Sequence, residues 1–246
     1  MGLTAIIGGS GFASLPGFDI DEARAVSTAF GAPSARLVRG RLAGRELLFL
    51  PRHGVEHGVP PHRINFRANV QALYDAGADR VVGLAAVGGI GADLPPLRLC
   101  VPDQIVDYTF GREHTFHRGG GGAVVHVDFS HPYSASLRRL LLGAAVEAGV
   151  DVRDGGTYGA TQGPRLETCA EIRRLQRDGC DMVGMTAMPE AALARERGLS
   201  YATLAFVVNW AAGKTEAEIT MDRIHANLEH CADSVLRILH GLAART

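Results

Sequence analysis

The chain has 246 residues, of which 46% are hydrophobic, and its formal net charge is -1 at pH 7. A chain of this length can bury a full hydrophobic core. Almost all of its positive charges are arginines, with Lys214 the only lysine, and they are scattered along the sequence without a basic stripe. This pattern excludes nucleic acid as an expected partner.

Neither a linker nor a low-complexity tract divides the chain, so we expect a single domain over residues 1–246. No apolar run approaches the roughly 18 residues that a membrane span needs, and the N-terminus lacks a basic segment of the signal-peptide type. The four cysteines are widely spaced without a CxxC pair, which is typical of a reduced, cytoplasmic protein. His114 and His117 form an HxxH pair without further ligands in register, so we expect no metal site there.

The first strand signal is the apolar run of residues 3–7, which leads directly into GGSG at 8–11. Consecutive glycines let a backbone approach a ligand closely, and the Ser10 hydroxyl beside free amides can hold an oxyanion. A dinucleotide-binding fingerprint is a weaker interpretation, because Ser14 stands where the third glycine should be. A phosphate loop and a plain glycine turn explain this segment about equally well.

Residues 36–40 and 45–50 form a predicted hairpin, after which Arg52 and His53 lie on a new loop. An Arg beside a His suits a dianion, because Arg supplies a fork of donors and His a further donor. The alternative is a pair of solvated surface side chains.

The middle of the chain continues the alternation of helix and strand. Residues 65–76 have helical spacing, and residues 80–90 form a long apolar run that is broken by glycines near its end. Residues 97–127 mix short strand signals with a glycine run at 119–122, which predicts a mobile loop.

Residues 134–149 predict a helix that Ser134 caps, and residues 157–162 predict a strand. Glu167 then falls at the start of a further helix, where the helix dipole favours a carboxylate. Taken alone, that position explains Glu167 without any function.

The sequence DMVGMTAMPE at 181–190 requires a sharp turn between a strand and a helix. The apolar run ends in GMT at 184–186, and Pro189 with Glu190 opens a helical pattern. Strand ends of this kind carry ligand groups in α/β sheets. Without other information, an ordinary buried turn is the simpler interpretation.

The last predicted elements are a strand over residues 201–208 and a long amphipathic helix over residues 220–242. The strand ends at Asn209, which places a polar amide at the lip of a buried strand. The helix presents Met221 and Ile224 at its start, where core packing is the alternative. The alternation of strands and helices predicts an α/β sandwich with a largely parallel or mixed sheet, whose glycine-rich strand ends converge at one edge.

In this order and spacing, six segments closely resemble the family of methylthioadenosine phosphorylases and trimeric purine nucleoside phosphorylases. They are IIGGSG at 6–11, RHG at 52–54, HRINFRAN at 62–69, GPRLETCAE at 163–171, GMTAMPEAALARE at 184–196 and NWAAG at 209–213. The resemblance spans nearly the whole chain. It implies a three-layer α/β sandwich with a central mixed sheet, assembled as a homotrimer or a dimer of trimers.

The resemblance also implies a reaction in which inorganic phosphate, as co-substrate, replaces the purine at C1′ of a nucleoside without a metal or an organic cofactor. Family members often have a hydroxyl residue where this chain has Ala85, so we expect one phosphate contact to be missing. The positions that match the family's motifs imply the following roles. Phosphate would be bound by Ser10, Arg52, His53, the backbone of Ala86 and Thr186. Met185 would contact the ribose, Asn209, Trp210 and Ala211 would contact the base, and Asn209 and His53 would be the catalytic residues.

Two of these positions are expected to select the base. In the adenine-specific branch of the family, Asp stands at the position of Asn209 and Ser at the position of Glu167. A carboxylate can only accept, which suits the N1–H of a 6-oxopurine and opposes the bare N1 of adenine. Asn209 can donate to O6 and accept from a protonated N7. The pair therefore predicts hypoxanthine or guanine as the leaving base.

The part of the site that surrounds the 5′ substituent of the sugar is expected to be apolar. Met221 and Ile224 align with apolar residues of the methylthioadenosine enzymes, and by the same alignment His126 reaches over from a neighbouring subunit. An apolar pocket suits a methylthio group and leaves a 5′-hydroxyl unpaired. A 6-oxopurine with a methylthio sugar predicts S-methyl-5′-thioinosine as the substrate.

Four alternatives stay open at the level of sequence. Two lie within the family: phosphorolysis of methylthioadenosine and phosphorolysis of 6-oxopurine nucleosides in general. A hydrolase that uses water would not depend on phosphate. A non-catalytic nucleotide-binding module would suit the glycine turns, but it leaves Arg52, His53, Thr186, Glu167 and Asn209 unexplained together.

Overall fold

The computed structural model describes residues 2–119 and 124–246, and their strands join in one sheet. The strands are β1 (Leu3–Gly8), β2 (Asp19–Arg24), β3 (Leu37–Leu42), β4 (Arg45–Pro51), β5 (Ala78–Gly89), β6 (Leu99–Val101), β7 (Gln104–Asp107), β8 (Val152–Asp154), β9 (Thr157–Ala160), β10 (Met182–Gly184) and β11 (Ser200–Trp210). The helices are α1 (Phe66–Asp75), α2 (Ala135–Glu147), α3 (Cys169–Arg177), α4 (Ala187–Glu196) and α5 (Met221–Arg245), with a short 3-10 helix at Pro61–Arg63.

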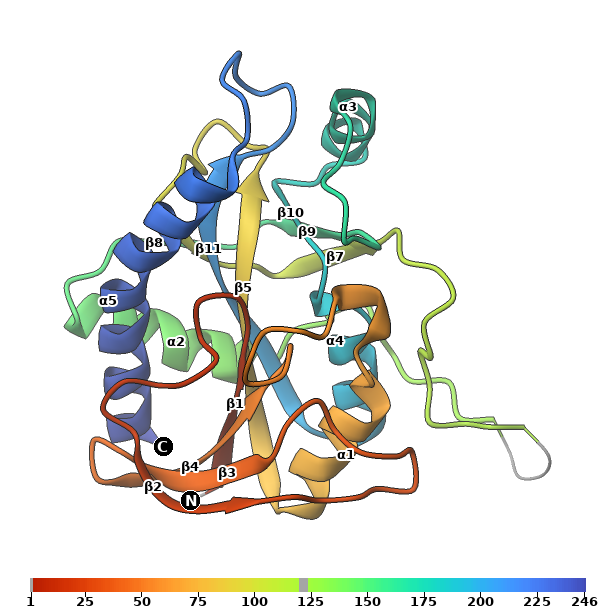
Figure 1. The fold of residues 1–246 in the computed structure, drawn as a ribbon, viewed down its shortest axis with the longest axis vertical. Helices are drawn as coiled ribbons and strands as arrows, with labels where there is room; N and C mark the ends of the chain where they lie inside the picture. The colour runs from red at the N-terminus through yellow and green to blue at the C-terminus, as the bar shows by residue number, and fades with distance from the viewer. Residues whose placement is uncertain (1, 120–123) are drawn as a thin grey trace.

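The sheet is mixed, and β5 is its central strand (Figure 1). Along one edge β5 pairs in parallel with β11. Along the other edge it pairs first in parallel with β1 and then, near its end, antiparallel with β10. Beyond β1 follow β4, β3 and β2, and beyond β10 follow β9 and β7.

Helices cover both faces of this sheet, with α2 and α5 on one face and α1 and α4 on the other (Figure 1). Successive side chains of β1 divide between the two cores: Ala5 and Ile7 belong to the cluster that contains α1 and α4, whereas Ile6 belongs to the cluster with α2 and α5. A strand that is covered on both faces buries side chains at successive positions, which explains why Ala5, Ile6 and Ile7 are all apolar; the polar Thr4 is buried as well. The predicted three-layer α/β sandwich with a central mixed sheet is confirmed.

The ends of β1 and β10 meet over the middle of β5. β1 runs parallel to β5 and stops with Ile7 opposite Gly83, whereas β10 runs antiparallel to β5 and begins with Met182 opposite Gly89. The two carboxyl ends therefore point toward each other across the intervening residues of β5. This arrangement brings the GGSG turn and the GMT turn to the same place, although they lie far apart in the sequence.

The predicted elements match the structure within a few residues, apart from the short strand β8, which was not expected, and the following differences. β2 was not expected, and all six of its residues are exposed, so it lacks the apolar pattern by which a strand is recognised. The helix expected from Pro189 begins at Ala187, with an irregular backbone at Met188. β11 continues through Asn209 and Trp210, which were expected to follow the strand.

Two further predictions concern the segments around the sheet. α3 begins after its N-cap, Thr168, which forms a capping box with Glu171, so Glu167 lies just before the helix that was expected to begin there. The mobile loop predicted for the glycine run at 119–122 lies, apart from Gly119, outside the described residues.

Candidate active site

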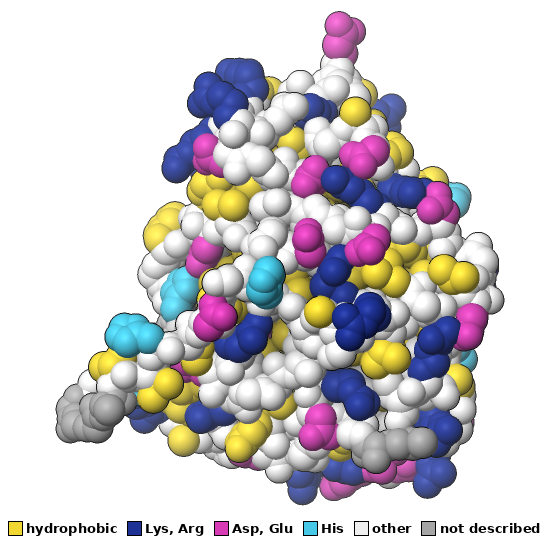
Figure 2. All heavy atoms as spheres, turned by 180° about the vertical axis from the view of Figure 1, so that it is seen from behind, with side chains coloured by type: hydrophobic (Ala, Val, Ile, Leu, Met, Phe, Trp, Pro, Cys, Tyr) yellow, Lys and Arg dark blue, Asp and Glu magenta, His cyan; other side chains and the backbone are white. Residues whose placement is uncertain are grey.

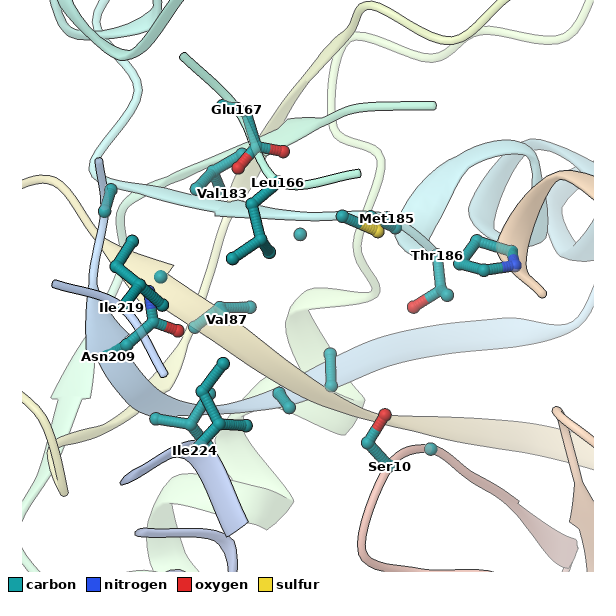
Figure 3. Close-up of a pocket in the computed structure, with 18 of the residues that line it drawn as sticks. Ser10, Val87, Leu166, Glu167, Val183, Met185, Thr186, Asn209, Ile219 and Ile224 are labelled. Atoms are coloured by element: carbon teal, nitrogen blue, oxygen red, sulfur yellow. The ribbon is translucent and has the colours of Figure 1, made fainter. Parts of the chain in front are cut away.

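A cavity lies where β1 and β10 meet over β5, and it contains most of the residues that the sequence singled out (Figure 3). In the view of Figure 3, the hydroxyls of Ser10 and Thr186 face each other at one end, which we call the hydroxyl end. Glu167 and Asn209 lie at the other, which we call the amide end. Apolar side chains complete the wall: Val87, Leu166, Val183, Met185, Val208, Ala211, Ala212, Ile219 and Ile224.

The glycine turn after β1 brings the backbone unusually close to β5. A Cβ atom at Gly9 would lie 2.4 Å from the carbonyl oxygen of Leu84 and 2.8 Å from Nη1 of Arg52, so only glycine fits there. Ser10 follows, and its Oγ lies 3.4 Å from Nε2 of His57. Close packing of this turn, rather than a left-handed conformation at Gly9, places Ser10 at the cavity.

Arg52 forms a buried ion pair with Glu190 at the hydroxyl end. Its Nε donates to Oε1 of Glu190 at 2.8 Å and its Nη2 donates to Oε2 at 2.9 Å, while Nη1 donates to the carbonyl of Leu84 at 2.8 Å. The two charged side chains are 1% and 0% exposed. Burial alone would lower the pKa of the Arg52 guanidinium, but the ion pair with Glu190 raises it above its ordinary value. Arg52 thus lines the cavity with a charge that Glu190 already balances.

His53 is buried beside Arg52 and is neutral at physiological pH. Burial, and secondly the charge of Arg52, lowers the pKa of His53 to about 4. Its Nδ1 lies 2.8 Å from the carbonyl oxygen of Val59, which assigns the ring proton to Nδ1 and leaves Nε2 as an acceptor. The neutral ring therefore offers an acceptor, where the sequence suggested a donor.

A β-bulge near the end of β11 sets the position of Asn209. Val207 lies opposite Val87 and Asn209 lies opposite Gly88, so Val208 is the extra residue in the strand. The side-chain Nδ2 of Asn209 donates to the carbonyl of Trp210 at 2.8 Å. Because this bond holds the amide nitrogen, it orients Oδ1 as the free acceptor of the side chain (Figure 3).

Glu167 lies at the amide end and is held by a neighbouring threonine. The hydroxyl of Thr161 donates to Oε1 of Glu167 at 2.6 Å. Among the residues that the structure describes, Oε2 receives no hydrogen bond. Thr161 lines an adjacent hollow together with Glu167, Tyr108 and Phe110.

Arg112 organises the site from outside the cavity, and the sequence analysis did not select it. Its guanidinium donates to the carbonyls of Met185 at 2.8 Å, Met188 at 2.6 Å, Thr161 at 3.2 Å and Gln162 at 2.9 Å, and to the side chain of Gln162 at 3.2 Å. These bonds use all five donors of the side chain. Arg112 ties the turn after β10 to the segment after β9, a role that no local sequence signal indicates.

The cavity brings together most of the predicted site residues and leaves three of them outside its lining. Those that line it are Ser10, Arg52, His53, Ala85, Ala86, Glu167, Met185, Thr186, Asn209, Ala211 and Ile224. Trp210 borders an adjacent hollow, Met221 is 57% exposed, and His126 lies in the exposed segment before α2. The single chain does not test contacts from a second subunit, so the roles given to Met221 and His126 stay predictions. Ile219 and Leu166 join the lining without having been predicted.

The sequence profile of the phosphorylase superfamily matches residues 4–244. The chain belongs to this superfamily. It is 51% identical to a protein named probable S-methyl-5′-thioinosine phosphorylase in Xanthomonas campestris, over 97% of this chain and 96% of that protein. It is 39% identical to a 6-oxopurine nucleoside phosphorylase of Pyrococcus furiosus, over 96% of this chain and 89% of that protein.

The same superfamily appears among solved structures. A methylthioadenosine phosphorylase of Schistosoma mansoni in complex with adenine superposes with a TM-score of 0.95. The two chains are 33% identical, and the match covers 99% of this chain and 91% of the other. The fold and the enzyme class, a pentosyltransferase of the purine nucleoside phosphorylase type, follow from these similarities.

Outside the cavity, the described residues carry few features that suggest other ligands. None of their helices is long and apolar enough to cross a membrane. Residues 2–119 and 124–246 contain no group of three or more His, Cys, Asp or Glu side chains suited to a metal ion. That the enzyme works without a cofactor stays a prediction. On the face that Figure 2 shows, acidic and basic side chains intermingle.

Proposed function

We propose that this enzyme catalyses the phosphorolysis of S-methyl-5′-thioinosine to hypoxanthine and 5-methylthioribose 1-phosphate. The proposal rests on one observation: Glu167 and Asn209 both lie at the amide end of a cavity that has the hydroxyls of Ser10 and Thr186 at its other end. The names of relatives in Xanthomonas campestris and Pyrococcus furiosus support a 6-oxopurine base.

The amide end would bind the base. Oε2 of Glu167 would accept from N1–H of hypoxanthine, and Oδ1 of Asn209 would accept from N7–H as the base leaves. Adenine has no proton on N1, so a carboxylate would face its lone pair and repel it. Met185 would lie against the ribose and Ala211 would border the base, with Trp210 next to it in the adjacent hollow.

The hydroxyl end would bind phosphate. Ser10, Thr186, the backbone of Ala86 and the remaining donors of Arg52 would donate to its oxygens. The neutral ring of His53 would accept from a protonated phosphate oxygen at Nε2. Because Glu190 balances Arg52, hydrogen bonds and dipoles would supply most of the stabilisation here.

The reaction would exchange one bond at C1′ for another. A phosphate oxygen would form a bond to C1′ as the bond from C1′ to N9 breaks, and the electron pair would pass to the base. The base would take up a proton at N7 from solvent and leave neutral, and the phosphate would release a proton to solvent as it becomes an ester, so that the charges balance. Positive charge on the sugar would develop beside the phosphate, and the proton at N7, held by Oδ1 of Asn209, would offset the negative charge that the base receives. Holding phosphate and nucleoside in one cavity would add an effective-concentration gain.

The apolar side chain of Ile224, with Met221, would receive the methylthio group, and His126 would be supplied by a neighbouring subunit. The enzyme would therefore work as a homotrimer or a dimer of trimers. We further propose that residues 1–246 form a single catalytic domain, which acts in the cytoplasm without a metal or an organic cofactor.

The test is an assay of base release from methylthioinosine, methylthioadenosine and inosine, each with and without phosphate. We expect hypoxanthine release that depends on phosphate, with methylthioinosine far ahead of inosine. The fold similarity to the Schistosoma mansoni enzyme makes methylthioadenosine the main competing substrate. If it is the best substrate, the roles of Glu167 and Asn209 are wrong, and base release without phosphate would indicate a hydrolase.

A further inference from the structure

We infer that Thr161 positions Glu167 so that the cavity takes hypoxanthine nucleosides in preference to guanine nucleosides. The inference rests on the proposed function, because it concerns how the same carboxylate meets the base. It adds a specificity-determining residue that lies outside the cavity and does not touch the base.

The hydroxyl of Thr161 has one proton and two acceptors within reach. Its Oγ1 lies 2.6 Å from Oε1 of Glu167 and 3.3 Å from the carbonyl oxygen of Gly184. A hydrogen bond to a charged oxygen is shorter and stronger than one to a neutral carbonyl. The proton therefore goes to Glu167, and one of the two lone pairs of Oε1 is used before any base enters.

The backbone of Thr161 is fixed on both sides. Its N–H donates to the carbonyl of Gly184 at 2.8 Å, which extends the pairing of β9 with β10. Its carbonyl accepts from Nη2 of Arg112 at 3.2 Å. The sheet and Arg112, rather than a bound substrate, thus decide where the hydroxyl lies and which oxygen of Glu167 it holds.

The two 6-oxopurines differ at the edge that a carboxylate recognises. Guanine presents N1–H and an adjacent 2-amino group, two parallel donors that need both carboxylate oxygens. Hypoxanthine presents N1–H alone and needs one. Because Oε1 already accepts the short bond from Thr161, it is the weaker acceptor of the two oxygens. Oε2 can accept from N1–H, but the 2-amino group of guanine is left with this weakened partner. A donor that gives up water without gaining a full hydrogen bond weakens binding.

The test compares the 5′-methylthio nucleosides of hypoxanthine and guanine on three enzymes: wild type, Thr161→Val and Thr161→Ser. We expect wild type to favour the hypoxanthine nucleoside by about tenfold in kcat/KM, the factor that one hydrogen bond typically supplies. Valine matches threonine in shape and removes the donor. The ratio of kcat/KM for the hypoxanthine nucleoside to that for the guanine nucleoside should therefore fall toward one, mainly through a lower KM for the guanine nucleoside. Serine keeps the hydroxyl and should keep the preference.

Inhibition of the wild-type enzyme by the free bases provides a second measurement that does not need the Val variant to fold. Hypoxanthine should inhibit about tenfold more strongly than guanine. Equal use and equal inhibition by the two bases would overturn the inference and leave the proposed function intact. An unchanged preference in a folded Thr161→Val enzyme would also overturn it. If wild type releases neither base when phosphate is present, both proposals are wrong.

Discussion

The guanidinium of Arg52 and the carboxylate of Glu190 pair through two parallel hydrogen bonds of 2.8 and 2.9 Å, although 138 residues separate them in the chain. Tyr201 adds a third bond to the carboxylate, from its hydroxyl to Oε2 at 2.8 Å. Arg52 follows β4 and Glu190 lies in the first turn of α4. The pair therefore joins two segments that both border the hydroxyl end.

Replacing Glu190 with glutamine should leave the buried charge of Arg52 without a counterion. We expect the free energy of unfolding, measured in urea, to fall by about 3–5 kcal/mol. The double variant Arg52→Met with Glu190→Leu should regain much of that lost stability, because it removes both charges. Its KM for phosphate should nevertheless be higher than that of wild type. If the free energy of unfolding of the Glu190→Gln variant is within about 1 kcal/mol of wild type, the ion pair does not stabilise the fold.

The base preference should follow the two residues of the amide end. We expect Glu167→Ser combined with Asn209→Asp to shift the ratio of kcat/KM toward methylthioadenosine over methylthioinosine by about 100-fold, because mispaired polar groups discriminate strongly. Leu166→Ala is the matched control, since Leu166 lines the same wall without a polar side-chain atom. If both variants change the ratio equally, cavity shape rather than hydrogen bonding selects the base.

The sugar preference should depend on Ile224. A hydroxyl introduced by Ile224→Thr should lower the ratio of methylthioinosine to inosine by about tenfold in kcat/KM. The variant Met221→His tests the same ratio of methylthioinosine to inosine at a side chain that is 57% exposed in the single chain. We expect it to favour inosine if a neighbouring subunit covers Met221. An unchanged ratio in both variants would place the 5′ pocket elsewhere.

The buried His53 should make stability depend on pH in a defined window. Its folded-state pKa of about 4 lies below the ordinary value of 6.5, so the unfolded chain binds the proton first as pH falls. The stabilisation is complete above pH 6.5 and is lost as pH falls toward 4, by about 3 kcal/mol at most. Unfolding of wild type and His53→Gln in phosphate-free buffer should show a shallower slope for the variant in this range. Parallel curves would contradict a neutral, buried His53.

The sequence by itself determined the layers of the fold and the segments that build the cavity. Apolar runs that end in glycines, such as residues 3–7 before Gly8 and Gly9, encode buried strands and the close turns that follow them. These signals lie within a few neighbouring residues, so periodicity and turn chemistry are enough to read them. The motifs around Ser10, Arg52, Thr186 and Asn209 pointed to one site through their resemblance to the phosphorylase family.

Only the tertiary structure decided how those side chains are used. The ion pair of Glu190 with Arg52, the extra residue at Val208 and the five bonds of Arg112 depend on strand register and on contacts between distant segments. No local pattern encodes such pairings, because each partner is compatible with several simpler roles. Glu167 illustrates the reason: its place at the start of a predicted helix suggested an interaction with the helix dipole, whereas the pairing of β9 with β10 positions Thr161 to donate a hydrogen bond to its Oε1.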